Sequence, residues 1–171
     1  MLSIHDFRYS SDAPYPPVRA ESRNPAYARV MLDNIGGTNS EMSAISLYVF
    51  NNLITEYNQD IAAVFHQISI VEMHHLEIFG KLAFQLGEEP RMWTHYGCKK
   101  IYWSPSCNQY CKDLPAMMRN VIDGEKAAVS KYQHQISYIR DENIAENLRR
   151  IILDERLHVE IFEKIYAKYC S

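Results

Sequence analysis

Two long stretches of the chain, at about residues 60–87 and 144–169, carry apolar residues at every third or fourth position. This period is typical of a helix that buries one stripe of its surface in a bundle. The first stripe consists of Ile61, Phe65, Ile68, Glu72, His75, Phe79, Leu82 and Leu86, and the second of Ile144, Leu148, Ile151, Glu155, His158, Phe162, Ile165 and Tyr169. Each stripe is apolar or aromatic except for one glutamate and one histidine near its middle.

Two further helices with this period are predicted from about 39 to 57 and from Asp113 to about 140, and a short helix over 27–35 ends at the pair Gly36-Gly37. The stripes of the two longer helices are Glu41, Ile45, Tyr48 and Asn52, and Met118, Val121, Glu125, Tyr132, Ile136 and Ile139. The order of elements is hairpin, connection, hairpin. We therefore predict an all-α four-helix bundle as one domain over residues 25–171.

Two segments lack a helical period. Residues 1–24 contain three prolines and are predicted to form an extended arm, free to lie on a neighbouring subunit. Residues 88–112 contain two prolines that exclude a regular helix, together with five aromatic residues. A crossover that joins two parallel helices along the length of the bundle would explain a loop of this length. Its aromatic side chains would pin it to the surface or to another subunit.

The two helical hairpins form an internal repeat. Glu72-Met-His-His75 has a near copy, Glu155-Arg-Leu-His158, at an offset of 83 residues. A glutamate and a histidine three residues apart on a helix project from the same face, so both can reach one metal ion. A buried carboxylate costs several kcal/mol unless it is paired or binds a metal. Glu72 and Glu155 carry this free-energy cost at matching positions of the repeat, which indicates that one shared feature, such as a metal site, offsets both.

Each repeat also has an upstream glutamate in its stripe. Glu41 precedes Glu72 by 31 residues and Glu125 precedes Glu155 by 30, which places all four carboxylates at a similar height in an antiparallel bundle. Four carboxylates carry a charge that two divalent ions would neutralise, and carboxylate with imidazole suits iron or manganese. The alternative is a metal-free bundle with buried ion pairs. No lysine or arginine shares the stripes to supply them.

This pattern resembles that of the ferritin-like di-metal carboxylate superfamily, which has one glutamate from each of two helices and Glu-x-x-His from each of the other two. The resemblance covers the four helices, about residues 39–169. It implies a ferritin-like fold with two metal ions. By the resemblance Glu72 and Glu155 would bridge the ions, Glu41 and His75 would complete one site, and Glu125 and His158 the other.

Within that superfamily the chain looks most like rubrerythrin-type proteins, because Tyr48 lies seven residues after Glu41 and Asp154 directly precedes Glu155. The resemblance implies that Asp154 holds His75 of the opposite motif. His158 must then use a carbonyl, water or another side chain, because Val71 stands at the equivalent position of the first repeat. The stretch from Asn24-Pro-Ala-Tyr-Ala through Gly36-Gly37 to Glu41 looks instead like manganese catalases and their spore-coat relatives.

The chain also departs from rubrerythrins. Ala128 stands where they carry a further glutamate one turn after the ligand of the third helix, and residues 1–171 contain none of the Cys-x-x-Cys pairs of a rubredoxin domain. Tyr48 and Tyr132 each follow a candidate ligand by seven residues. Both tyrosines could be ordinary core residues. Alternatively, each could donate a hydrogen bond to a ligand carboxylate or take part in redox chemistry. His74 is predicted to be solvated, and Glu77 to form an exposed pair with the lysine four residues on.

Composition limits the kinds of partner, cellular location and metal centre that are expected. The net charge of −3 is small and the basic residues are scattered among acidic ones, so no nucleic-acid partner is expected. No signal peptide and no membrane-spanning run is recognisable, which favours a cytoplasmic protein. Cys98, Cys107, Cys111 and Cys170 form no Cys-x-x-Cys pair. Free thiols are therefore expected rather than a zinc or rubredoxin-type centre.

The resemblance implies a non-haem di-iron or di-manganese oxidoreductase that reacts with hydrogen peroxide or O2, of the rubrerythrin-like peroxidase type. Its electrons would come from a separate donor protein, and it would form a homo-oligomer, a dimer or larger. A manganese catalase is an alternative that needs no outside reductant. Ferritin-type iron oxidation and storage is another, and a metal-free structural role is the last.

Overall fold

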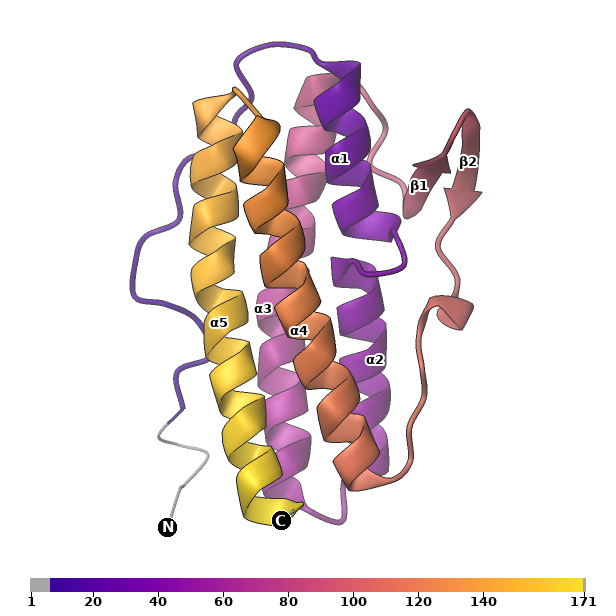
Figure 1. The fold of residues 1–171 in the computed structure, drawn as a ribbon, viewed down its shortest axis with the longest axis vertical. Helices are drawn as coiled ribbons and strands as arrows, with labels where there is room; N and C mark the ends of the chain where they lie inside the picture. Colours follow the sequence, from indigo (N-terminus) through magenta and orange to yellow (C-terminus); the bar gives the residue numbers. More distant parts are fainter. Residues whose placement is uncertain (1–6, 171) are drawn as a thin grey trace.

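The computed structural model describes residues 7–170. Four long helices form two antiparallel hairpins that pack side by side (Figure 1). They are α2 (Glu41–Ile54), α3 (Gln59–Leu86), α4 (Leu114–Tyr138) and α5 (Glu142–Tyr169). The all-α four-helix bundle predicted from the sequence is confirmed.

A short helix, α1 (Pro25–Gly36), stands above α2 and continues its direction, so that the two together span the length of α3 (Figure 1). The chain breaks between them at Gly37, whose backbone is extended. Gly36 is required for a close approach, because a Cβ atom there would lie 2.4 Å from the backbone nitrogen of Trp93 in the crossover. The break sets Glu41 at the very start of α2.

Helix starts are fixed by capping side chains, which determine where each buried stripe begins. The oxygen of a cap accepts a hydrogen bond from a backbone N–H in the first turn of each of these five helices. The caps are Asn24, Ser40, Asn58, Asp113 and Asp141. The long helix α3 ends at Gly87, which adopts a left-handed φ of 109°.

The crossover joins α3 and α4, which run parallel, and it descends along the outside of α1 and α2 (Figure 1). It contains an antiparallel hairpin of β1 (Trp93–Tyr96) and β2 (Lys99–Tyr102), followed by a 3-10 turn, η2 (Pro105–Cys107). The sequence interpretation expected only an irregular loop here. The two-residue turn at Gly97, with φ of 60°, was the available sign of a hairpin.

Two apolar clusters fill the bundle, one above and one below its middle. The upper cluster includes Phe79, Leu82 and Ile151, and the lower one includes Phe65 and Phe162. Every predicted stripe residue of α3 is buried. In α2 the stripe is shifted by one position, because Asn51 is buried whereas Asn52 is only half-buried. The polar residues near the middle of α3 and α5 are thus closed off above and below.

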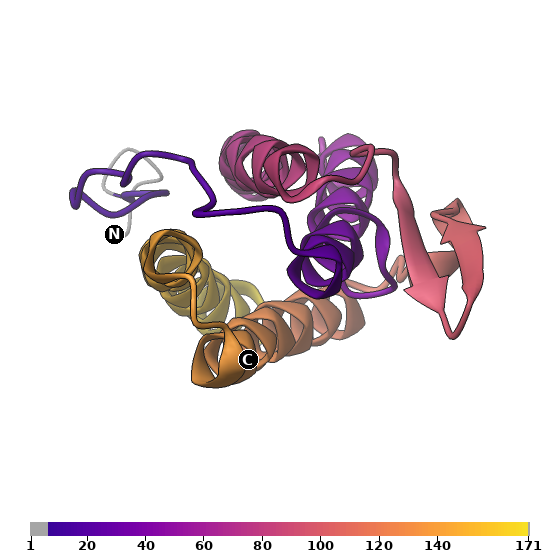
Figure 2. The same ribbon diagram turned by 90° about the horizontal axis from the view of Figure 1, so that it is seen from above.

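Residues 7–24 form an arm without helix or strand that runs along the side of the bundle between α3 and α5 (Figures 1 and 2). Side chains of both helices hold it. The Gln85 side chain accepts a hydrogen bond from the backbone N–H of Ala20, and the Asp141 carboxylate accepts one from that of Glu21. The arm therefore packs against the helices of its own chain.

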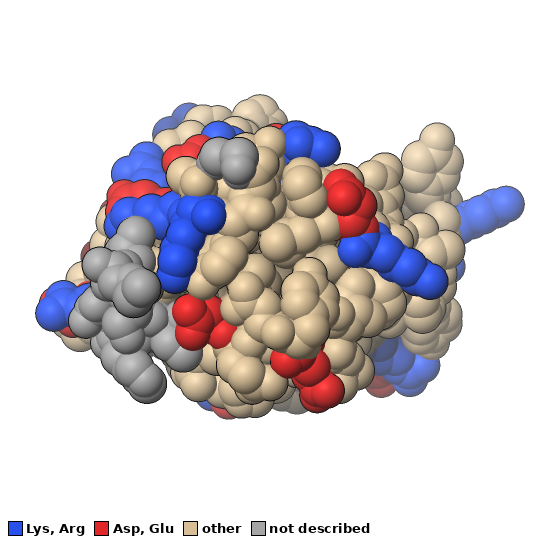
Figure 3. All heavy atoms as spheres, turned by 90° about the horizontal axis from the view of Figure 1, so that it is seen from below, with Lys and Arg blue, Asp and Glu red and all other residues tan. Residues whose placement is uncertain are grey.

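At the lower end of the bundle, basic and acidic side chains alternate among uncharged ones, without a broad patch of one sign (Figure 3). Within residues 7–170, no helix has both the length and the apolar character that crossing a membrane requires.

Candidate metal centre

Six side chains from four helices converge at mid-height of the bundle, between the two apolar clusters. All are at most 3% exposed. They are Glu41 of α2, Glu72 and His75 of α3, Glu125 of α4, and Glu155 and His158 of α5. The structure thus brings together all six residues that the sequence analysis singled out.

The six residues form two overlapping groups whose ligand atoms lie within 4.8 Å of one another. Glu41 and His75 belong to one group, and Glu125 and His158 belong to the other. Both groups share Glu72 and Glu155. This is the arrangement of two adjacent sites with two common carboxylates.

The shared carboxylates each turn one oxygen toward each histidine. His75 Nδ1 lies 3.1 Å from Glu72 Oε2 and 3.2 Å from Glu155 Oε1. His158 Nδ1 lies 2.9 Å from Glu72 Oε1 and 3.4 Å from Glu155 Oε2. Ligand atoms about 3 Å apart can occupy adjacent corners around an octahedral ion with bonds of about 2.1 Å. The donor set therefore fits two ions bridged by Glu72 and Glu155.

Two buried atoms at this centre support the fit. Glu72 Oε1 and His158 Nδ1 lie only 2.9 Å apart. When His158 is neutral with its proton on Nε2, both atoms are acceptors, so their close approach requires a proton or a cation between them. A cation held by both atoms would meet this requirement.

Without metal, the pKa values of four of these six side chains are raised. Burial and the neighbouring carboxylates raise the pKa of Glu41 well above its usual range and that of Glu125 to about 7. Burial alone would lower the pKa of His75 and His158, but the surrounding carboxylates raise both well above the ordinary value. Protons thus offset part of the negative charge that cations would otherwise neutralise.

Two tyrosines cross between the hairpins. Tyr48 of α2 donates a hydrogen bond to Glu125 Oε1 of α4, and Tyr132 of α4 donates one to Glu41 Oε1 of α2 at 2.5 Å. Burial raises the pKa of both hydroxyls well above 10, so both remain donors. The sequence left open whether these tyrosines are ordinary core residues or partners of the ligands. In the structure, each donates a hydrogen bond to a candidate ligand carboxylate.

The outer nitrogens of the two histidines have different partners. His75 Nε2 lies 3.0 Å from Asp154 Oδ2, and His158 Nε2 lies 2.9 Å from the backbone oxygen of Tyr9. Each acceptor favours the tautomer with a proton on Nε2, which leaves Nδ1 free to face the centre. Asp154 therefore contacts the histidine of the opposite motif, and His158 uses a carbonyl.

Asp154 is fully buried and has its own counter-ion. Arg150, one turn earlier in α5, lies 2.7 Å from Asp154 Oδ1 and is itself only 5% exposed. Burial raises the pKa of Asp154, but hydrogen bonds led by that from His75 outweigh this effect and hold it well below its usual range. Sequence reasoning missed Arg150, although its spacing of four residues from Asp154 was a sign of the pair.

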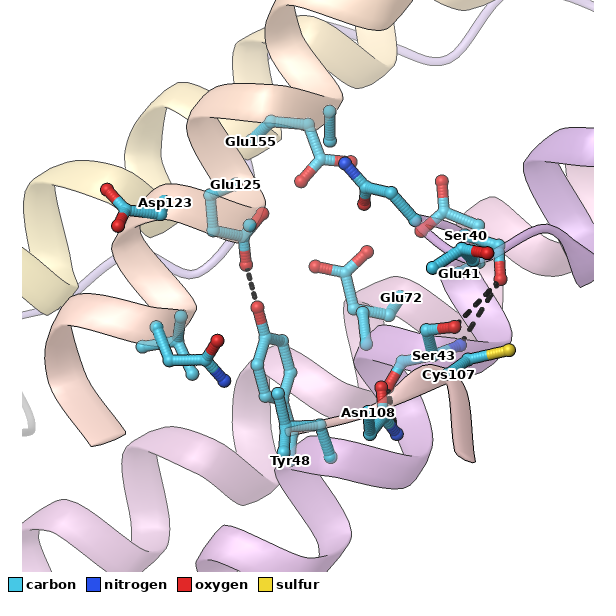
Figure 4. A pocket seen from close by; sticks show the side chains of 18 of the residues that line it. Ser40, Glu41, Ser43, Tyr48, Glu72, Cys107, Asn108, Asp123, Glu125 and Glu155 are labelled. Carbon is cyan, nitrogen blue, oxygen red and sulfur yellow. Dashed lines mark hydrogen bonds between the residues drawn. The ribbon is translucent and has the colours of Figure 1, made fainter. Parts of the chain in front are cut away.

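A cavity of about 280 Å³ leads to the carboxylates from the side of α2 and α4 (Figure 4). Glu41, Glu72, Glu125 and Glu155 line its inner end. Polar residues of the α1–α2 break and of the crossover line it as well, and these are Thr38, Asn39, Ser40, Cys107, Asn108 and Gln109. Ala128 also lines it, where a glutamate side chain would occupy part of this space.

Other sequence expectations concern residues around the centre. His74 is exposed, and its ring meets the edge of Tyr15 at 4.5 Å between centroids. Glu77 pairs with Lys81 at 2.7 Å on the surface, as predicted. All four cysteines are free thiols, and none belongs to a candidate metal group within residues 7–170.

Comparison with known proteins finds similar sequences and similar structures. A probable manganese catalase of Clostridium acetobutylicum is 21% identical over 169 residues, which cover 88% of this chain and 75% of that protein. The crystal structure of wild-type KatB, a manganese catalase from Anabaena, superimposes with a TM-score of 0.82 at 24% identity, over 95% of this chain and 80% of that one. A second structure of KatB, from Anabaena PCC7120, gives a TM-score of 0.81 at 23% identity over the same shares.

These structural matches confirm the ferritin-like fold. The model of the Rubrerythrin family matches residues 37–166, which include all six candidate ligands. The resemblance identified from the repeated Glu-x-x-His motif is thereby confirmed, and the chain belongs to the rubrerythrin family.

Proposed function

We propose that this protein is a non-haem di-metal oxidoreductase that acts on hydrogen peroxide. One observation carries the proposal, namely that Glu72 and Glu155 each turn one oxygen toward each of two histidines. The rubrerythrin match and the similarity to manganese catalases support an oxidoreductase of the catalase or peroxidase type. Iron and manganese are the candidate ions, and both suit a set of carboxylates and imidazoles.

Bound iron or manganese would supply the capacity to accept and return electrons. Glu41, Glu72, His75 and Glu155 would hold one ion, and Glu72, Glu125, Glu155 and His158 the other. The four carboxylates would balance two divalent charges in a site that the apolar clusters close above and below. Asp154 does not disturb this balance, because Arg150 neutralises it. Tyr48 and Tyr132 fix the two carboxylates that are not shared.

The cavity favours a small polar substrate. Hydroxyl and amide groups line the route to the carboxylates, and these can exchange hydrogen bonds with a molecule that both donates and accepts. Hydrogen peroxide has this character, whereas O2 lacks it. Apolar residues such as Ile68 and Phe79 pack above and below the centre, so a substrate would reach the carboxylates through this cavity.

Two reactions of peroxide remain to be separated. A catalase converts two molecules of hydrogen peroxide into two of water and one of O2, with peroxide as both oxidant and reductant. A peroxidase reduces one molecule of peroxide to two of water with two electrons and two protons, and it needs a separate electron-donor protein. The manganese-catalase relatives favour the first, and the rubrerythrin family match keeps the second in consideration.

Loading the purified protein with Mn²⁺ or Fe²⁺ tests the proposal. We expect the manganese form to evolve O2 from hydrogen peroxide, and the reduced iron form to be oxidised rapidly in stopped-flow absorbance measurements. If neither form reacts faster than the free metal ion at the same concentration, the proposed function is wrong. Iron storage requires a hollow shell of many subunits, so the solution mass of the protein separates that alternative from a small oligomer.

A further inference from the structure

The arm reaches the outer nitrogens of both candidate histidine ligands within a few residues. Its Tyr9 carbonyl oxygen lies 2.9 Å from His158 Nε2. Six residues later, the Tyr15 hydroxyl donates a hydrogen bond of 2.5 Å to Asp154 Oδ2, the oxygen that contacts His75 Nε2 at 3.0 Å. One short segment of the arm therefore lies behind both halves of the centre.

Four partners surround the Asp154 carboxylate, and this set of contacts is called the clamp. The Oδ2 atom of Asp154 faces His75 and Tyr15, and its Oδ1 atom accepts a hydrogen bond from the Ser11 backbone N–H at 2.7 Å. Arg150 completes the clamp through an ion pair with Oδ1. The arm thus supplies two of the donors that fix the orientation of this carboxylate.

Arg150 also fastens the arm itself. Its Nε atom donates to the backbone oxygen of Ala13 at 2.6 Å, and an Nη atom donates to that of Ser11 at 2.8 Å. Its guanidinium lies over the Tyr15 ring, 3.9 Å from the centroid. Because the same arginine holds both the arm and Asp154, the arm cannot leave without loosening the carboxylate behind His75.

We propose that residues 7–15 form a strap that orients both histidines toward the metals, with Tyr15 as a positioning residue that acts through Asp154. This inference rests on the proposed di-metal centre. A histidine ligand is oriented by the acceptor of its outer N–H, and loss of such a partner typically lowers metal affinity roughly 10–100-fold. Here the acceptors for both histidines depend on how the strap is seated.

Strap docking and metal binding must then strengthen each other equally, because coupling between two binding events is reciprocal. A seated strap raises the affinity for metal, and bound metal keeps the strap seated. Hydrogen exchange of the Ser11 amide measures directly whether the strap is docked, because this N–H donates to Asp154 when the strap lies on the bundle. This exchange should therefore be slower in the metal-loaded protein than in the metal-free protein.

The test uses the full chain and Mn²⁺. Tyr15→Phe removes the hydroxyl but keeps the ring beside Arg150, and we expect it to weaken Mn²⁺ binding roughly 10-fold in competition with a chelator. Tyr166→Phe is the matched control, because its hydroxyl accepts from Arg119 on the surface, away from the centre. That variant should bind Mn²⁺ like the wild type.

Hydrogen exchange at Ser11 in the wild-type protein, with and without Mn²⁺, supplies a readout that needs no variant. If the wild type binds no Mn²⁺ or Fe²⁺, the di-metal centre itself is wrong. If the wild type binds two ions but Tyr15→Phe binds them as tightly, or if exchange at Ser11 is unchanged by metal, the strap proposal alone is wrong.

Discussion

The two helical hairpins present the same inner residues to the centre but surround them differently. Each hairpin contributes a glutamate from its first helix and Glu-x-x-His from its second, and their tyrosines cross reciprocally to the opposite glutamate. Behind the histidines the symmetry ends. His75 contacts a carboxylate that is clamped by a buried arginine, whereas His158 contacts a backbone carbonyl.

This comparison shows which part of a duplicated site is free to diverge. The inner residues share one buried cluster, so a change in one carboxylate alters the charge balance of both ions. The outer acceptor has only to receive an N–H, which a carboxylate or a carbonyl can do. A carboxylate acceptor makes its histidine the more basic ligand. We therefore expect the His75 site to bind metal more tightly than the His158 site.

The largest effect is expected from the shared carboxylates. Glu72→Ala or Glu155→Ala should cost both metal ions, because either change removes an oxygen from each site. Metal stoichiometry by elemental analysis measures this. Glu77→Ala, on the surface of the same helix as Glu72, should retain both ions. Two ions found in either of the first two variants would disprove the bridging assignment.

A second expected effect is a difference in the pH dependence of stability between the metal-free and the metal-loaded protein. Glu125 has a pKa raised to about 7, and the pKa values of His75 and His158 are raised well above their ordinary value. Between about pH 5 and 8 the folded metal-free state therefore binds more protons than the unfolded state, and its stability falls as pH rises.

The Tm of the metal-free protein should accordingly decrease from pH 5 to pH 8. In the loaded protein the metal ions replace these protons, so the decrease should be smaller or reversed. Differential scanning calorimetry with and without Mn²⁺ measures both trends. A metal-free protein whose Tm rises over this range would contradict the raised pKa values.

A third change tests the asymmetry itself. Asp154→Asn leaves an acceptor beside His75 but removes its charge, so we expect a loss of metal affinity of roughly 10-fold or more, mainly at the His75 site. Titration of the wild type should resolve two unequal sites, and the variant should bring them closer together. Glu163→Gln removes an exposed charge from the surface of the same helix, α5, and serves as the control. Two equivalent sites in the wild type would refute the asymmetry.

The smallest effect is expected from the crossed tyrosines. Tyr48→Phe and Tyr132→Phe each remove one hydrogen bond to a buried carboxylate, and each should lower the free energy of unfolding by about 1–2 kcal/mol. Because the two contacts are reciprocal, the two losses should be similar. Urea unfolding of both variants checks this. A loss confined to one variant would show that the inner layer is also asymmetric.

The bundle and its six inner residues could be predicted because helical period and charge leave few alternatives. Glutamate and histidine within an otherwise apolar stripe are conspicuous, and their repetition fixes the register between hairpins. The contacts of the arm could not be predicted in this way. Tyr9 and Ser11 act through backbone C=O and N–H groups, which every such residue possesses, and an extended chain has no period that marks its buried side.

Other differences have local causes. The hairpin of β1 and β2 went unpredicted because strands of only four residues show little alternation, and only Gly97 marks the turn. Asn51 rather than Asn52 is buried because the inward face shifts by one position toward the end of α2. Whether the chain forms an oligomer, acts with a donor protein or resides in the cytoplasm stays a prediction from the sequence.

The interruption between α1 and α2 also decides whether the centre can be reached. Thr38, Asn39 and Ser40, which follow Gly37, form part of the wall of the cavity that descends to the carboxylates. A single unbroken helix in this position would seal that side with one continuous row of side chains. The metals would still be held, but as a permanently enclosed structural element. Gly36 and Gly37 thus interrupt the helix at the position where small molecules can reach the centre through the cavity.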